Sequence, residues 1–167
     1  AIASYSIDVD SFSCSDIGAN TVVLTVADSS GNTHSANATV TVLDNISPTA
    51  VAQNITVYLD ANGNASITGT DVNNGSTDNC AIASYSVLPN TFTCADSNAN
   101  PVTLTVTDVN GNSATATATV TVLDTFSPVV ITQNITIYLD ANGAASIVAA
   151  DVDNGSSDNC AIDSMSV

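Results

Sequence analysis

The chain repeats itself at an offset of 80 residues, and this internal repeat constrains its fold more than any other feature. The segment AIASYS at Ala1 returns at Ala81, and QNITVYLDANG at Gln53 returns as QNITIYLDANG at Gln133. Without any gap, the two copies agree at 26 of 44 positions in one half of the period and at 28 of 43 in the other. Eighty residues exceed most solenoid units and suit a small domain repeated in tandem.

The repeat predicts how the chain is divided into modules. If each boundary is the proline-bearing linker after TVLD, residues 45–124 form one complete module. Residues 1–44 would then be the C-terminal part of a preceding repeat, and 125–167 the N-terminal part of the following one. Both ends fall inside patterned sequence, so we expect the chain to be a piece of a longer array.

Within the complete module the hydrophobic period is two, which is the period of a β-strand. Apolar residues alternate with Asn, Thr or Tyr over 54–59, with Thr over 102–107, and with Thr again over 114–122. Such strands bury one face and expose a polar face. Further strands are expected at 65–69, 81–87 and 91–94, and no helix is predicted. The pattern favours an all-β, immunoglobulin-like sandwich.

The charge composition excludes several functional classes. The chain carries 16 acidic groups, one histidine, and neither lysine nor arginine. Without cations it cannot neutralise nucleic-acid phosphates or dock on anionic lipid through a basic patch. Catalysis by a Walker-type or Schiff-base lysine is also excluded. No apolar run approaches the roughly 20 residues of a membrane span, so we expect no membrane insertion in this segment.

The four cysteines obey the same 80-residue offset. Cys80 and Cys94 lie symmetrically about a predicted strand-turn-strand segment, so we predict that they pair with each other. Cys14 and Cys160 would then pair with cysteines outside the chain. Zinc is the competing interpretation, but there is no CxxC motif and only one histidine. Disulfides indicate an oxidising, extracellular setting, and with it secretion or a place on the cell surface.

The motifs also resemble a known family. TLTVTDVNGNSATATATVTVLD at Thr103–Asp124 is similar to the closing half of a hyalin repeat (HYR) module. SPTAVAQNITVYLDANG at Ser47–Gly63 and STDNC at Ser76–Cys80 resemble other parts of HYR-type repeats, which giant surface proteins of Bacteroidetes-type bacteria carry in long arrays. The resemblance implies an immunoglobulin-like fold, an extracellular location, an adhesive or spacer role, and no catalytic activity. The chain departs from the family pattern where Ala52 replaces a frequent first-strand cysteine.

Acidic and amide side chains gather in the loops, in a density that suits Ca²⁺. If each module runs from pole to pole, the loop 71–79 and the turn Asp108–Asn112 lie near the linker that precedes the module. The turn at Asp60–Asn64 would lie near the linker that follows it. We therefore expect Ca²⁺ ligands at the joints, meaning the linkers between modules and the loops around them, among Asp44, Asp60, Asn62, Asp71, Asn73, Asp78, Asp124, Asp151, Asp153 and Asp158. The competing interpretation is that these residues serve only turns and loop caps.

Two functional classes remain. The leading hypothesis is a structural segment of a long extracellular stalk, adhesin or filament, whose partners are neighbouring copies of the same repeat or chain. The alternative is a ligand-binding module of a surface adhesin, for carbohydrate such as surface glycans, for ice, or for a partner protein. A binder should carry an unusual loop in one module, whereas the copies here are alike, which favours the spacer. Because the acidic cluster recurs every 80 residues, we do not expect an enzyme.

Overall fold

The computed structural model describes residues 1–166, so residue 167, the last of the predicted segment 125–167, lies outside the described residues. Most of the regular structure is strand, and the prediction of an all-β chain is confirmed. The strands are β1 (Ile2–Ile7), β2 (Gly18–Asp28), β3 (Thr33–Val42), β4 (Ile55–Tyr58), β5 (Asn64–Ser66), β6 (Ile82–Leu88), β7 (Thr91–Thr93), β8 (Asn98–Asp108) and β9 (Ser113–Leu123). No helix among the described residues has the length and hydrophobicity to span a membrane.

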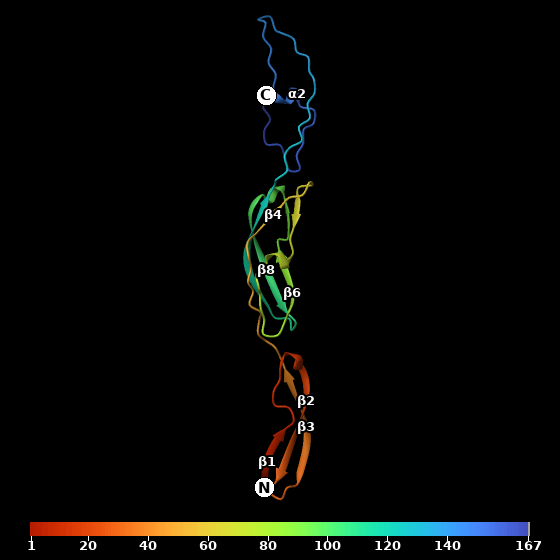
Figure 1. Ribbon diagram of the computed structural model, residues 1–167, viewed down its shortest axis with the longest axis vertical. Helices are drawn as coiled ribbons and strands as arrows, with labels where there is room; N and C mark the ends of the chain where they lie inside the picture. Colours follow the sequence, from red (N-terminus) through yellow and green to blue (C-terminus); the bar gives the residue numbers. More distant parts are fainter. Residues whose placement is uncertain (167) are drawn as a thin grey trace. The chain divides into compact units, whose positions relative to one another are not determined.

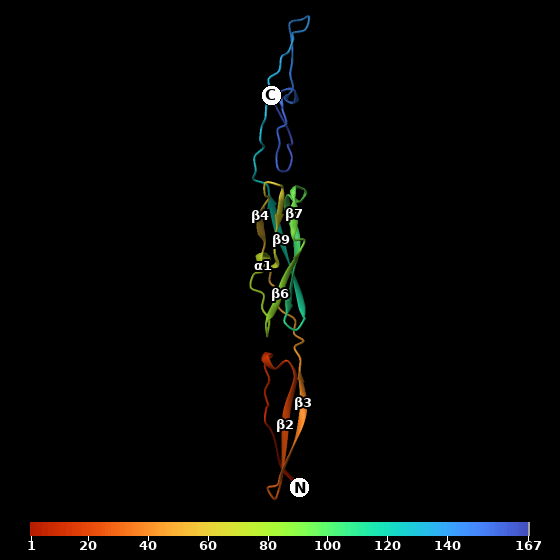
Figure 2. The ribbon, with the colours of Figure 1, turned by 90° about the vertical axis from the view of Figure 1, so that its right-hand side faces the viewer.

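The described strands form three sheets (Figure 1; Figure 2). One is the antiparallel sheet β1-β2-β3. The second has the order β4-β9-β8-β6, and β4 runs parallel to β9 with Ile55 opposite Val120. The third is the antiparallel pair β5-β7, in which Ala65 lies opposite Phe92. Strands β6 and β7 follow each other along the chain but belong to different sheets. Cys80 precedes β6 and Cys94 follows β7, so these two cysteines do not lie opposite each other in a hairpin.

The core is built on the alternation that the sequence shows. On β8, Leu104 and Val106 are fully buried, while Thr103 between the apolar positions is exposed. On β9, Val120 and Val122 are likewise fully buried. Burying a Val or Leu side chain contributes roughly 1.5–3 kcal/mol, so these two neighbouring strands carry much of the stability of the four-stranded sheet.

The prediction of no helix is wrong at four short segments. One-turn α-helices occur at α1 (Gly69–Val72) and α2 (Ala149–Val152), and 3₁₀ turns at Cys14–Asp16 and Cys94–Asp96. At α1, the Asp71 carboxylate accepts hydrogen bonds at 2.7 Å from both the backbone N–H and the hydroxyl of Thr68. Asp71 thereby satisfies the N–H of the N-cap residue, as the acidic member of a capping box does, which stabilises the turn inside a β-rich chain.

The described residues gather in two compact units. The first combines 1–49 with 77–84 and 106–114, and the second combines 50–76 and 85–105 with the residues from 115 onward. Each unit therefore draws on two consecutive repeats. The division into modules 1–44, 45–124 and 125–167 stays a prediction.

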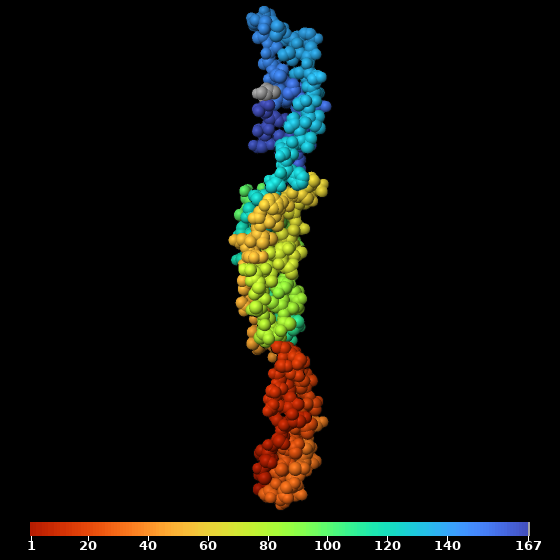
Figure 3. Space-filling model, in the orientation of Figure 1, coloured from red at the N-terminus to blue at the C-terminus, as the bar shows by residue number. Residues whose placement is uncertain are grey.

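Within the second unit, one repeat packs less completely than the other. Val72 is fully buried, whereas its counterpart Val152, 80 residues later, is only partly buried. Val152 lines a cavity of about 290 Å³ together with Pro128, Val130 and Met165. The space-filling view shows the hollow within this C-terminal part (Figure 3). Equivalent valines of the two repeats are thus buried to different extents, because an apolar side chain leaves water only where other parts of the chain cover it.

Candidate metal centre

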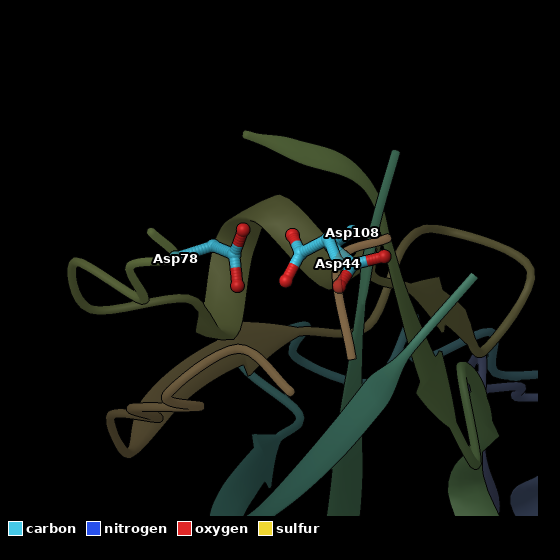
Figure 4. Close-up of side chains that lie close together, drawn as sticks. All are labelled: Asp44, Asp78 and Asp108. Atoms are coloured by element: carbon cyan, nitrogen blue, oxygen red, sulfur yellow. The ribbon is translucent and has the colours of Figure 1, made fainter. Parts of the chain in front are cut away.

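Three carboxylates from distant parts of the sequence lie together in the first unit. Asp44 follows β3, Asp78 precedes β6, and Asp108 is the last residue of β8. One carboxylate oxygen from each lies within 4.8 Å of the others. Figure 4 shows the carboxylate of Asp78 facing those of Asp44 and Asp108. Among residues 1–166 this is the group of three metal-ligating side chains that lies close enough to share an ion.

Asp108 is the most buried member of the cluster, with only 2% of its surface exposed. Its Oδ1 accepts the backbone N–H groups of Asn110 at 2.8 Å and Asn112 at 2.9 Å, and its Oδ2 accepts the Asn112 side-chain amide at 2.8 Å. Burial raises the pKa of this carboxyl, but the hydrogen bonds from Asn112, Asn110 and Gly111 outweigh burial and hold its pKa below the ordinary value. The turn after β8 therefore keeps a negative charge in a nearly closed site.

Asp44 and Asp78 each use one oxygen and leave the other without a partner. Oδ1 of Asp44 accepts the Ile46 backbone N–H at 3.1 Å and the Asn79 amide at 3.2 Å, and Oδ2 of Asp78 accepts the Cys80 N–H at 2.9 Å. Oδ2 of Asp44 and Oδ1 of Asp78 are buried and have no hydrogen-bond partner. Buried, unpaired carboxylate oxygens are costly, and they become favourable when a cation binds them.

The cluster could therefore hold a metal ion. The chain contains no lysine or arginine that could neutralise three neighbouring carboxylates. Carboxylate oxygens are hard ligands that suit hard divalent cations. Of the expected ligands, the structure brings together Asp44 and Asp78, and it adds Asp108, which the sequence placed near the same linker but not among the ligands.

The same arrangement recurs 80 residues later, in the second unit. Asp124 is the counterpart of Asp44, and its Oδ1 accepts the Asn159 amide at 3.1 Å, as Asp44 accepts Asn79. Asp158 is the counterpart of Asp78; its Oδ2 accepts the Cys160 N–H at 3.0 Å, and its Oδ1 is buried without a partner. The hydrogen bonds of two of the three carboxylate positions are thus repeated, and the buried oxygen without a partner is repeated at Asp158.

The remaining expected ligands are engaged in local hydrogen bonds. Asp60 accepts the N–H groups of Asn62 and Asn64 within its turn, so that Asn62 serves the turn through its backbone. Asp71 caps α1, as described above, and Asp151 accepts the N–H of Val148 at the start of α2. The Asn73 side chain accepts the backbone N–H and the hydroxyl of Ser76, and Asp153 accepts the N–H groups of Gly155 and Ser156. These side chains follow the turn-and-cap interpretation.

The predicted Cys80–Cys94 disulfide is wrong. Cys14 is bonded to Cys80, with 5.5 Å between their Cα atoms, and Cys94 to Cys160, with 5.3 Å. The partners that we expected outside the chain for Cys14 and Cys160 are therefore inside it, and there is no free cysteine among the described residues. Cys80 and Cys94 flank two strands that lie in different sheets, so they are not cross-strand neighbours. The two disulfides indicate an oxidising, extracellular environment.

Comparison with known protein families and with characterised proteins yields no match.

Proposed function

We propose that this chain is a structural segment of a long extracellular stalk, adhesin or filament, built from HYR-like, immunoglobulin-like modules and stiffened by Ca²⁺ and disulfides at each joint. The observation that carries the proposal is a set of contacts around each linker aspartate that recurs after 80 residues. The tripeptide Asp-Asn-Cys at 78–80 supplies a carboxylate to the metal centre, an amide to the linker aspartate Asp44, and a sulfur to Cys14. Residues 158–160 repeat the contacts to the linker aspartate and the disulfide.

A joint that recurs with the repeat suits a scaffold better than an active centre. The disulfide sulfur of Cys14 lies 3.6 Å from the carbonyl oxygen of Asn79, and that of Cys94 lies at the same distance from the carbonyl oxygen of Asn159. Function must be argued from the residues of a site, and here the contacts of the Asp-Asn-Cys tripeptide recur with the repeat, as expected of a structural element. We therefore propose that the segment is not an enzyme.

Calcium is the cation that we propose for the centre. Calcium–oxygen distances are about 2.3–2.6 Å, so oxygens on opposite sides of one ion lie up to about 5 Å apart. The three carboxylate oxygens lie within 4.8 Å of one another, which is inside that span. The ion would bind the two unpartnered oxygens and connect the linker aspartate Asp44 to the Asp78 loop and the β8–β9 turn. It would remove the repulsion that otherwise loosens the joint.

The tandem-module organisation is supported by differences in burial between equivalent positions. Leu104 on β8 is fully buried, whereas its counterpart Leu24 on β2 is 38% exposed. Val152, the counterpart of the fully buried Val72, is likewise only partly buried. Both differences are expected if 45–124 is a complete module and the flanking residues belong to other modules.

The test is thermal unfolding of the protein after removal of divalent ions. An ion that binds only the folded state adds RT ln(1 + [L]/Kd), which is about 2.7 kcal/mol at a hundredfold excess over Kd. We expect millimolar Ca²⁺ to raise the Tm of the wild-type protein and a chelator to reverse the rise.

Two variants make the test specific. Asp78→Asn removes one ligand charge and should abolish most of the Ca²⁺-dependent rise. Asp10→Asn removes one negative charge from an exposed aspartate outside the cluster, so the Ca²⁺-dependent rise in Tm should be preserved. If Ca²⁺ leaves the wild-type Tm unchanged, or if both variants behave alike, these aspartates are ordinary turn residues and the calcium proposal fails.

A further inference from the structure

The disulfides create a second covalent route along the chain, much shorter than the backbone. Each bond joins cysteines 66 residues apart, while the repeat period is 80. Residues 15–79 and 95–159 are therefore closed loops that the covalent route bypasses. Between the two bonds the route uses only the segment from Cys80 to Cys94.

We propose that the two disulfides form a load-bearing bypass that limits extension and keeps the chain continuous when a loop is broken. Tension applied to the ends follows the covalent route, so it cannot straighten the 66-residue loops even when they unfold. The load-bearing role rests on the proposed stalk function, whereas the covalent route follows from the disulfide pairing alone.

The segment between Cys80 and Cys94, which carries the tension, can lengthen only slightly. Of the residues between Cys80 and Cys94, seven form β6 and three form β7. A strand already rises by about 3.3 Å per residue, close to the limit of about 3.3–3.6 Å for a fully extended chain. Pulling these strands out of their sheets would therefore lengthen this segment only slightly. With the bypass, one repeat can add about 55 Å at most to the extended length of the chain. Without it, the 80 residues of a repeat could extend to roughly 270 Å.

The bypass also makes most backbone breaks harmless to continuity. A cut inside either loop leaves both cut ends attached through a disulfide. A cut between Cys80 and Cys94 separates the chain. The long loops, including the turn at Asp108–Asn112, are thus protected, whereas a single cut in the mostly strand-forming segment 81–93 separates one disulfide-closed loop from the other.

A pair of single substitutions tests this directly, because the chain has no natural trypsin site. Asn110→Arg places the only site inside the Cys94–Cys160 loop, and Asn90→Arg places the only site between Cys80 and Cys94. Both side chains are exposed, so both variants should fold, which circular dichroism can check. Each oxidised variant is then unfolded in urea and treated with trypsin.

We expect cleaved Asn110→Arg to run as one species on a non-reducing gel and as two after reduction. Cleaved Asn90→Arg should separate into two pieces without reductant. The reverse pattern would indicate the Cys80–Cys94 pairing and overturn the proposal. The proposal would also fail if both cleaved variants stayed in one piece without reductant, or if both separated into two. The result does not depend on calcium, so it distinguishes failure of the bypass from failure of the proposed metal joint.

Single-molecule stretching between the two ends measures the mechanical consequence. Reducing one disulfide should lengthen the chain by about 220 Å, because it frees 66 residues at roughly 3.4 Å each. Two such steps should occur on adding reductant, and none before. Steps of about 40 Å, the value for a loop closed between Cys80 and Cys94, or extension to full length without reductant, would contradict the bypass.

Discussion

Gly63 lies against the Cys94–Cys160 disulfide, and replacing it with alanine should measure how tightly this joint is packed. Gly63 has a φ of +74°, in the left-handed region, and its N–H donates to the carbonyl of Asp60 at 2.9 Å. A Cβ added there would stand 2.6 Å from Cys94 Sγ and 2.9 Å from the carbonyl oxygen of Asn159. Its repeat counterpart Gly143 has a φ of +77° and nothing within 4 Å of the added atom.

The two substitutions differ in one respect only. Both alanines bear the cost of a left-handed conformation, about 1–2 kcal/mol. At Gly63 the new methyl group must also displace a disulfide sulfur by roughly 0.8 Å to reach ordinary contact, and overpacking of this kind costs about 1–3 kcal/mol. We therefore expect Gly63→Ala to destabilise the protein by about 2–5 kcal/mol and Gly143→Ala by about 1–2 kcal/mol.

Urea unfolding followed by circular dichroism gives both values, because both turns belong to the second unit. Repeating the pair in a background with Cys94→Ala and Cys160→Ala should reduce the difference, since the contact with the sulfur is then gone and only the contact with the Asn159 carbonyl oxygen remains. Equal effects of the two glycine substitutions in the oxidised protein would refute the packing of this turn on the disulfide.

Three further predictions address the rest of the structure. Replacing Cys14 and Cys80 together by serine should lower the free energy of unfolding by about 4 kcal/mol in denaturant titration, because each disulfide closes a 66-residue loop; a loss below about 1 kcal/mol would argue against that pairing. The pKa of Asp108 is held below 3.8, so its charge stabilises the fold above that pH and the contribution disappears as pH falls through the lower folded-state pKa. Acid titration of stability in calcium-free buffer should therefore show a fall below pH 3.8 that Asp108→Asn flattens, and an unchanged slope would contradict it. Small-angle scattering should show a shorter maximum dimension after chelation, whereas an identical profile would exclude a Ca²⁺-stiffened joint.

The strands could be predicted from the sequence because alternation is a local signal. The alternation alone predicts that Val102, Leu104 and Val106 share one buried face, whichever strands lie beside them. All three are buried. The short helical turns also had a local signal that the strand pattern obscured. Thr68 with Asp71, and Thr93 with Asp96, each have the spacing of a capping box.

The disulfide pairing could not be predicted in this way, because it depends on which strands share a sheet. Pairing Cys80 with Cys94 and pairing Cys14 with Cys80 both obey the 80-residue period, so the repeat does not distinguish them. The deciding fact is that β6 and β7 lie in different sheets.

Asp108 was missed as a ligand for a related reason. Its sequence, Asp-Val-Asn-Gly-Asn, is that of an ordinary turn, and only the fold places that turn beside Asp44 and Asp78. Asp60, Asp71 and Asp153 had equally acidic surroundings in the sequence, but among the described residues none of them lies close to two further carboxylates, as Asp108 does.

The most direct test of the account is calorimetric titration of Ca²⁺ into protein stripped of divalent ions. We expect the wild-type protein to bind Ca²⁺ saturably at the site formed by Asp44, Asp78 and Asp108. This binding should be lost in Asp78→Asn and in Asp108→Asn, and it should be retained in Asp10→Asn. A wild-type protein that binds no Ca²⁺, or one whose binding survives both substitutions in the cluster, would contradict it.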